Sequence, residues 1–317
     1  MKKAVKGLVI TAAVVAGIAV LGSVAMGGFV ASQILNQNEG KDTHGNSLKQ
    51  LEIWEYDIDA FNSEYEGTEI SAVAEDGNEV PATYFDSEGD ECVILVHGAG
   101  GDRVSVYPLA QQYLEDGYDI IAIDQRGCGE NPDANVTFGI NESLDVKAMV
   151  RYAREELCYS KVIVHGQSMG AQTVAIYAAS VTKGDADAAD AVICDSPVPG
   201  MELMLREMFG EDMGGMNSVP VNYLIATSSA YMSLVNGIDY DDADTIALAS
   251  QITIPVLIIV SQQDEICLPD QVEQIYDNIT VCDKEIVYVS SAHIEGVIDD
   301  PEGYMNSVES FLADKGL

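Results

Sequence analysis

Short apolar runs recur along the chain from about residue 69 to its end, and longer stretches with helical spacing separate them. We expect strands at 69–74, 79–85, 92–97, 119–124, 161–165, 191–195, 255–261 and 285–289. Several of these runs are rich in Val and Ile throughout, which is typical of strands buried on both faces. Helices are expected at about 104–116, 142–157, 169–182, 269–279 and 301–314. This alternation predicts an α/β fold with a mostly parallel eight-stranded sheet flanked by helices.

Residues 197–251 break this alternation, because helix-like Met and Leu patterns are interrupted there by Gly-rich segments and no strong strand is visible. We expect a small helical cap in this interval. Such an insertion would lie beside the carboxyl ends of the strands, where open α/β sheets bind their ligands. Its apolar side chains would line a pocket or pack the cap against the rest of the domain. These side chains are Met201, Leu203, Met204, Leu205, Met208 and Phe209.

The N-terminus is basic over residues 1–6 and then carries no charge from Gly7 to Asn38, with an apolar stretch until about Val30. About 20 apolar residues span a bilayer, whereas the apolar core of a cleaved signal peptide has about 7–15. The length therefore favours a transmembrane anchor over 7–35, with signal cleavage and secretion as the alternative. The leading lysines favour a cytoplasmic N-terminus, so the remaining chain is expected outside the cytoplasm at the cell membrane. Residues 36–66 are expected to form a linker or N-terminal extension before a folded domain at 67–317.

The charge balance limits the classes of partner and cofactor. The chain has 52 acidic and 15 basic residues, a formal net charge of −37. Such a surface repels nucleic-acid phosphates, and no basic stripe offsets it, so nucleic acid is excluded as a partner. The six cysteines include no CxxC pair, which argues against a zinc ribbon or a thioredoxin-type centre. We therefore expect neither a metal site nor an organic cofactor.

The pentapeptide Gly166-Gln167-Ser168-Met169-Gly170 has the pattern G-x-S-x-G between the strand expected at 161–165 and a helix rich in Ala and Val. Glycines suit this position, because a nucleophile on a sharp strand-to-helix turn leaves no room for side chains beside it. We expect the turn to present the Ser168 hydroxyl as a nucleophile. The Met169 N–H, at the start of the helix, is expected to donate to a developing oxyanion.

A nucleophilic serine needs a base, and histidine is the usual choice. His44 lies in the expected linker, and His97 starts the sequence His-Gly-Ala-Gly-Gly at 97–101. His165 lies within a strand, where a packed role is expected. His293 follows the last expected strand, just before the C-terminal helix. By elimination and position, His293 is the predicted general base. The loop after His97 is expected to present the second oxyanion N–H, from Ala99 rather than Gly100.

The imidazole in turn needs a carboxylate that fixes its tautomer and stabilises its charged form. Asp264 follows the strand expected at 255–261, and Pro269 then opens a helix. Asp195, after the preceding strand, and the neighbouring Glu265 are competitors. The position of Asp264 after a penultimate buried strand favours it as the third member of a Ser–His–Asp triad.

The chain resembles the α/β-hydrolase superfamily over about residues 67–317. The resemblance rests on the G-x-S-x-G turn, on the chain order Ser168, Asp264, His293, and on a sequence at 124–129 similar to the family's D-x-R-G-x-G turn. It implies a structural role for Asp124 and Arg126. The chain is most similar to bacterial members with an N-terminal membrane helix, the serine aminopeptidase-like and Bem46-like hydrolases. Such membership implies hydrolysis of an ester, thioester, amide or peptide, and the shared fold does not choose among them.

We expect the protein to cleave a carboxylic ester or thioester through an acyl-enzyme intermediate, acting on a small-molecule or peptidic acyl substrate. One alternative is an exported peptidase or amidase with the same triad, in which acidic side chains of the cap bind a substrate amine; the candidates are Glu202, Glu207 and Asp212. Another is a noncatalytic surface-binding module that retains the fold.

Overall fold

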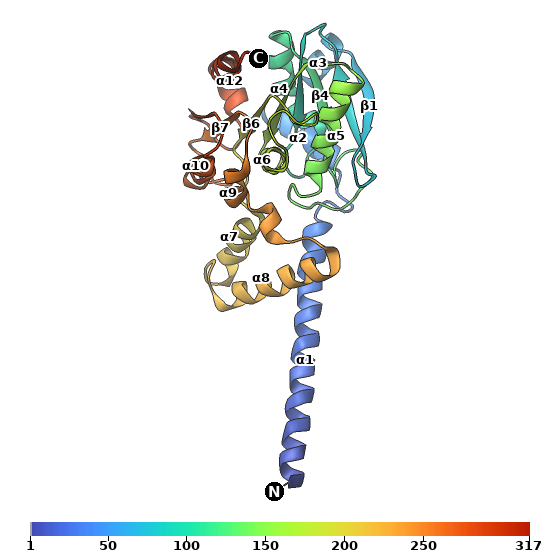
Figure 1. Ribbon diagram of the computed structural model, residues 1–317, viewed down its shortest axis with the longest axis vertical. Coiled ribbons are helices and arrows are strands. Elements are labelled where there is room, and N and C mark those ends of the chain that lie inside the picture. The colour runs from blue at the N-terminus through green and yellow to red at the C-terminus, as the bar shows by residue number, and fades with distance from the viewer. Residues whose placement is uncertain (1) are drawn as a thin grey trace. The chain divides into compact units, whose positions relative to one another are not determined.

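The structure is a computed structural model that describes residues 2–317, with side chains at residue 11 and from residue 14 onward. The chain forms two compact units. The larger comprises Asn36–Met201 and Asp241–Leu317. The smaller joins the N-terminal helix, up to Leu35, to Glu202–Tyr240. Figure 1 shows the course of the chain through both.

An eight-stranded sheet forms the centre of the larger unit, in the order β1-β2-β4-β3-β5-β6-β7-β8. β1 and β2 run antiparallel to their neighbours and the remaining pairs are parallel. The predicted fold class is confirmed, and each predicted strand is present to within two residues at either end. The strands are β1 Gly67–Val73, β2 Glu79–Phe85, β3 Glu91–Val96, β4 Asp119–Ile123, β5 Lys161–Gln167, β6 Ala191–Asp195, β7 Val256–Ser261 and β8 Lys284–Val289.

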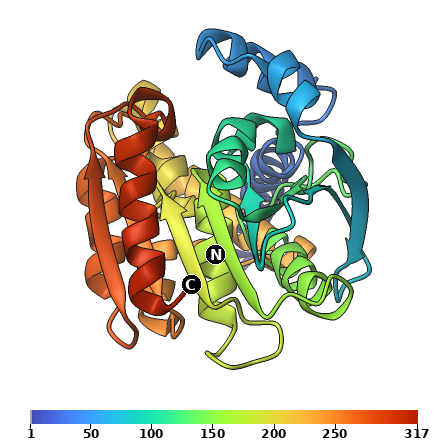
Figure 2. The same ribbon diagram turned by 90° about the horizontal axis from the view of Figure 1, so that it is seen from above.

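Helices cover both faces of this sheet, as the view in Figure 2 shows. α4 and α12 pack on one face around a core that includes Val93 and Leu95 of β3. α5 and α6 contact each other and β3, whose intervening residue Ile94 is also fully buried. Two-sided burial explains the continuous Val and Ile runs of the central strands. From residue 103 onward, the helices of this unit are η1 Arg103–Val106, α4 Tyr107–Glu115, α5 Glu142–Glu155, α6 Met169–Ser180, η3 Tyr240–Ala243, α9 Thr245–Leu248, η4 Ala249–Gln251, α10 Pro269–Asn278, α11 Gly296–Asp299 and α12 Pro301–Lys315.

The structure differs from the linker expected at 36–66, because most of this segment is helical and packed. α2 spans Thr43–Ile53 and α3 spans Ile58–Glu64. Each begins at an aspartate whose side chain accepts a backbone N–H of the first turn, Asp42 from Gly45 and Asp57 from Ala60. Leu51 and Phe61 are almost fully buried. Burial of these two apolar side chains stabilises the packing of α2 and α3 on the rest of the larger unit.

The turn after β4 is held by buried ion pairs. The Arg126 guanidinium is almost fully buried and contacts Asp145 at 2.7 Å and Asp76 at 2.6 Å. The Asp124 carboxylate accepts the Arg103 N–H at 2.9 Å. These contacts tie the turn to the loop between β3 and η1 and to α5. Asp124 and Arg126 thereby hold the loops at this edge of the sheet in place.

The smaller unit contains helices and, between residues 202 and 240, no strand. Its helices are α1 Lys2–Leu35, α7 Met201–Met213, α8 Val219–Tyr231 and the helical turn η2 Met232–Asn236. Within α1, Val14–Leu35 is long and apolar enough to cross a membrane, or to serve as a signal anchor. α1 packs directly on α8, and the Ser23 and Tyr223 hydroxyls lie 2.9 Å apart. The sequence predicted the N-terminal segment and the cap as separate parts. In the structure, the N-terminal segment and most of the expected cap belong to one compact unit.

Candidate active site

Ser168 occupies the turn between β5 and α6 with a strained backbone, φ 57° and ψ −120°. Its N–H donates to the Asp195 carbonyl at 2.9 Å, which fixes the turn on β6. A Cβ at position 166 would lie 2.4 Å from the Gly170 carbonyl oxygen, and one at position 170 would lie 2.1 Å from that of Val96. Only glycine fits at both positions, which explains the G-x-S-x-G pattern in steric terms.

His293 and Asp264 both lie beside Ser168, in a continuous hydrogen-bonded chain. His293 Nε2 is 2.8 Å from Ser168 Oγ, and its Nδ1 is 2.6 Å from Asp264 Oδ2. The other oxygen, Asp264 Oδ1, accepts the N–H groups of Ile266 and Cys267, each at 2.8 Å. The carboxylate is therefore held in place on both sides. The structure brings together three residues that lie far apart in the sequence.

The loop after β3 lies against the serine, since a Cβ at Gly98 would lie 3.3 Å from Ser168 Cβ. The buried His97 ring orients this loop. Its Nε2 accepts the Gln125 N–H at 3.0 Å, so Nδ1 carries the proton and donates to the Gly98 carbonyl at 2.7 Å. Because the peptide is trans, the Ala99 N–H points away from His97. Met169 is the first residue of α6, where a backbone N–H has no partner within the helix.

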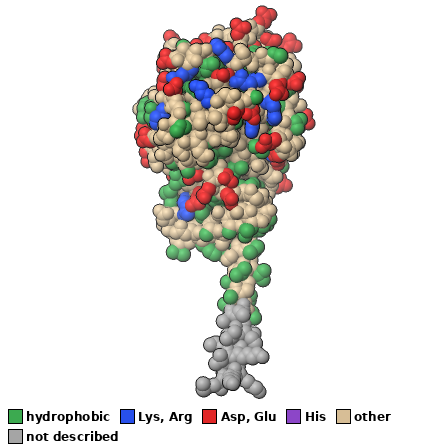
Figure 3. Space-filling model, viewed as in Figure 1, with side chains coloured by type: hydrophobic (Ala, Val, Ile, Leu, Met, Phe, Trp, Pro, Cys, Tyr) green, Lys and Arg blue, Asp and Glu red, His purple; other side chains and the backbone are tan. Residues whose placement is uncertain are grey.

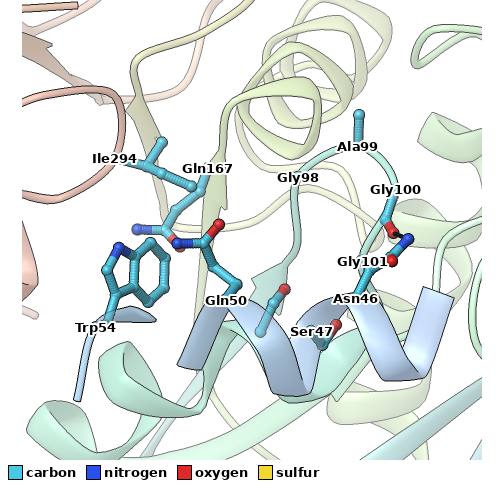
Figure 4. A pocket seen from close by; sticks show the side chains of 11 residues that line it. Asn46, Ser47, Gln50, Trp54, Gly98, Ala99, Gly100, Gly101, Gln167 and Ile294 are labelled. Atoms are coloured by element: carbon cyan, nitrogen blue, oxygen red, sulfur yellow. Dashed lines mark hydrogen bonds between the residues drawn. The ribbon is translucent and has the colours of Figure 1, made fainter. Parts of the chain in front are cut away.

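Two adjoining cavities open at this site, both lined by the larger unit. The first, of about 280 Å³, is lined by the 98–101 loop, Gln167, the α2 residues Asn46 and Gln50, and Trp54 directly after α2. Figure 4 shows these side chains, with Asn46 Nδ2 donating to the Gly100 carbonyl at 3.0 Å. The second cavity, of about 500 Å³, is lined by His293. Gln50, Trp54 and Ile294 line both.

The chain is similar to known hydrolases in sequence and in structure. The family model of the alpha/beta hydrolase fold matches residues 91–224. A thermostable monoacylglycerol lipase of a Bacillus species is 25% identical over 244 residues, which is 74% of this chain and 95% of the lipase. The protein YqkD of Bacillus subtilis is 22% identical over 221 residues, 69% of this chain and 70% of YqkD. The esterase Pf2001 of Pyrococcus furiosus has a similar structure, with a TM-score of 0.63 at 19% identity over 82% of this chain and 96% of the esterase.

The chain has the α/β-hydrolase fold and is similar in sequence to members of that superfamily. The comparisons support a hydrolase as its enzyme class. The narrower resemblance to serine aminopeptidase-like and Bem46-like hydrolases is not confirmed by them. Among the described residues, no group of three or more His, Cys, Asp and Glu side chains is placed to hold a metal ion.

The competing candidates within this hydrolase lie in a separate buried network. His165 Nδ1 is 2.9 Å from the Tyr113 hydroxyl and its Nε2 is 3.1 Å from that of Tyr304. The Tyr304 hydroxyl donates to Asp195 Oδ2 at 2.9 Å. Full burial lowers the pKa of His165 to about 3 and raises the pKa of Asp195. His165 is therefore a neutral, packed histidine, and Asp195 has no direct contact with His293.

Several residues of the hydrolase site were missed in the sequence. Gln50 of α2 and Trp54, directly after it, line both cavities, although this segment was expected to be a linker or N-terminal extension. Gln125 holds the Ala99 loop through His97 and accepts a hydrogen bond from Thr173 of α6 at 2.6 Å. The aspartates that begin α2 and α3 are the available sequence signals for those helices. Nothing comparable marks Gln125, whose partners His97 and Thr173 lie far from it in the sequence.

Proposed function

We propose that this protein is a serine hydrolase that cleaves a carboxylic ester or thioester through an acyl-enzyme intermediate. The observation that carries the proposal is the continuous chain from Ser168 Oγ through the His293 ring to Asp264, with distances of 2.8 Å and 2.6 Å. This geometry suits a nucleophile, a general base and a carboxylate that stabilises the imidazolium.

In the first step, Ser168 Oγ attacks the acyl carbonyl carbon while His293 Nε2 takes its proton. The Met169 and Ala99 N–H groups then donate to the oxyanion of the tetrahedral intermediate. His293 returns the proton to the leaving alcohol or thiol, and the acyl group stays on Ser168. In the second step, His293 deprotonates a water that attacks the acyl-enzyme, and Ser168 leaves with that proton. No step of this cycle uses a metal or organic cofactor.

The support for Ala99 as the second oxyanion donor is the hydrogen bond between the His97 ring and the Gly98 carbonyl. That bond fixes the orientation of the Gly98–Ala99 peptide, so the Ala99 N–H need not reorient when charge develops. A preorganised donor of this kind costs no reorganisation during the reaction.

For the substrate we favour an ester with an acyl chain, because the lipase relative is named for a monoacylglycerol. A peptidase or amidase is the second candidate, and one observation favours it. Glu265 and Glu295 line the cavity beside His293, where a carboxylate can bind a substrate amine. Turnover of p-nitrophenyl esters, acylglycerols and aminoacyl amides, compared side by side, distinguishes the two. Faster turnover of the amides would replace the ester assignment.

We also propose that α1 anchors the protein in the cell membrane, with the basic N-terminus in the cytoplasm and the hydrolase outside. The length and composition of Val14–Leu35 support a membrane span, and the lysines that precede it support this orientation.

The test of the nucleophile is Ser168→Ala, assayed with a short p-nitrophenyl ester. Loss of the hydroxyl removes the covalent route, so we expect kcat/KM to fall by about 10⁴-fold or more. Ser105→Ala is the matched control, because Ser105 lines the first cavity but donates to the Asp102 carbonyl and has no bond to His293. We expect the control to stay within about tenfold of wild type. Unchanged hydrolysis by Ser168→Ala would overturn the assignment.

A further inference from the structure

The stretch from Met213 to Ile238 in the smaller unit contains no Asp, Glu, Lys or Arg, although these residues make up 21% of the chain. Residues 162–182 are also uncharged, but they form β5 and α6, which are buried. The stretch at 213–238 forms α8 and η2, and much of it is exposed. Interior packing therefore explains the missing charges in the first stretch and does not explain them in the second.

The exposed side of α8 and η2 is uncharged and mostly apolar, with Asn222, Ser233 and Asn236 as its exposed polar residues. Val219 is 83% exposed and Leu234 is 86% exposed, and Tyr223 and Val235 are exposed with them. One side of the helix is already buried through Val221, so an opposite side facing water would normally carry charges. Figure 3 shows hydrophobic side chains at the lower edge of this unit, with its charged side chains higher up.

α8 is fixed to the candidate membrane helix by close backbone packing. A Cβ at Gly27 would lie 2.2 Å from the Thr227 carbonyl oxygen, and one at Gly28 would lie 2.9 Å from the Tyr231 ring. Small residues that let two helices approach this closely are typical of helix pairs in membranes. Figure 1 shows α8 running across α1 at this level.

The level of this crossing agrees with the thickness of a bilayer. At 1.5 Å per residue, the helix from Lys6, the last charge before the apolar stretch, to Gly27 is about 30 Å long, which is the thickness of the hydrocarbon core. With the lysines at one boundary, Gly27 and the helix that crosses it lie at the opposite boundary. Tyr223 and Tyr231 of α8 are of the residue type that gathers at such interfaces.

We propose that α8 and η2 form a second membrane-contact element, lying in the plane of the outer bilayer interface with Val219, Leu234 and Val235 inserted among the lipids. The occupant of this apolar surface is the bilayer itself. This surface suits lipid because it is uncharged and is continuous with α1, whose own apolar side chains are exposed. The inference rests on the proposed anchoring by α1, and it makes no use of the catalytic assignment.

The experiment uses the full chain in phosphatidylcholine vesicles that contain brominated acyl chains, which quench nearby tryptophan. Trp54 is the chain's only tryptophan, so Trp54→Phe gives a silent background. Into it are placed, one at a time, Leu234→Trp as the test, Leu21→Trp in α1 as the anchor reporter and Val281→Trp as the control. All three positions are exposed. We expect brominated lipid to quench the first two and leave the control unchanged.

The outcomes separate this inference from the anchoring on which it rests. Quenching at position 21 without quenching at position 234 overturns the α8 proposal and leaves the anchor intact. Absence of quenching at position 21 overturns both, whereas ester turnover still reports on the catalytic site. Protection of position 234 from aqueous iodide without lipid quenching would show a protein partner, such as a second copy, and would also overturn the proposal. Val219→Trp, at the other end of α8, repeats the test if Leu234→Trp misfolds.

Discussion

His293 and His165 are each connected to a buried aspartate, but only His293 also places a ring nitrogen beside a serine hydroxyl. His293 bonds Asp264 directly and places Nε2 beside Ser168, with 14% of its side chain exposed. His165 is fully buried, both ring nitrogens contact tyrosine hydroxyls, and it reaches Asp195 only through Tyr304. Burial and an acidic neighbour are thus common to both histidines. Of the two, His293 has a ring nitrogen beside a serine hydroxyl and lines a cavity, as its proposed catalytic role requires.

The largest expected effect separates the two histidines. His293→Gln removes the proposed base, so kcat/KM for a p-nitrophenyl ester should fall by about 10⁴-fold or more. His165→Gln changes a packed network, so folded enzyme should stay within about tenfold of wild type. Initial rates on the purified full chain, with circular dichroism to verify folding, provide the measurement. Comparable losses in both variants would contradict the comparison.

The same contrast applies to the two aspartates. Asp264→Asn leaves the ring nitrogen of His293 without its carboxylate, and we expect a loss of about 10³- to 10⁴-fold in kcat. Asp195→Asn puts an amide against the Tyr304 and Gln167 donors, which should lower the unfolding free energy by about 1–3 kcal/mol and kcat by less than about tenfold. Kinetics and urea denaturation together give both quantities. A greater loss of kcat in Asp195→Asn would reassign the carboxylate.

A smaller effect is expected at the tyrosine that bridges the buried network. Tyr304→Phe removes the hydroxyl that contacts both His165 and Asp195, and should lower the unfolding free energy by about 1–3 kcal/mol. Tyr288→Phe is the matched control, since its hydroxyl donates only to Glu273 and its side chain is exposed. The control should stay within about 0.5 kcal/mol of wild type. Equal losses in urea denaturation would show that the network contributes nothing specific.

The last expected effect is a dependence of stability on pH, which is small for each pH unit. The pKa of His165 is about 3 in the fold, below the ordinary value of 6.5. Between these two pH values the unfolded chain binds a proton that the native state excludes, so acidification lowers the unfolding free energy. This group alone contributes a slope of at most about 1.4 kcal/mol per pH unit. His165→Gln should therefore lose stability less steeply over that range. An unchanged slope in urea denaturation would show that His165 is protonated in the native state.

Most of the sheet and the three central residues of the site could be predicted from the sequence, because strands buried on both faces leave unbroken apolar runs. The turn at Ser168 was predictable from its two glycines, which the close approach of the Gly170 and Val96 carbonyls requires. α2 and α3 were not predicted, since their short polar sequences bury little beyond Leu51 and Phe61. The buried network also escaped prediction, because a contact between His165 and a residue 139 positions away has no local signal.

The packing of α1 on the expected cap was hidden for the same reason, with Ser23 and Tyr223 lying 200 positions apart. Glycines in an apolar helix are common, so Gly27 and Gly28 alone do not reveal a partner. The missing charges at 213–238 were the available signal, and they become informative only once the exposure of α8 is known.

The central claim, that Ser168 is the activated nucleophile, is tested most directly by covalent labelling with a fluorophosphonate probe and identification of the modified residue by mass spectrometry. Only a serine whose proton is taken by a neighbouring base should react at low probe concentration. The account predicts one label on Ser168 in the wild-type chain, none in Ser168→Ala, and strongly reduced labelling in His293→Gln. A label on another serine, or equal labelling of Ser168→Ala, would contradict it.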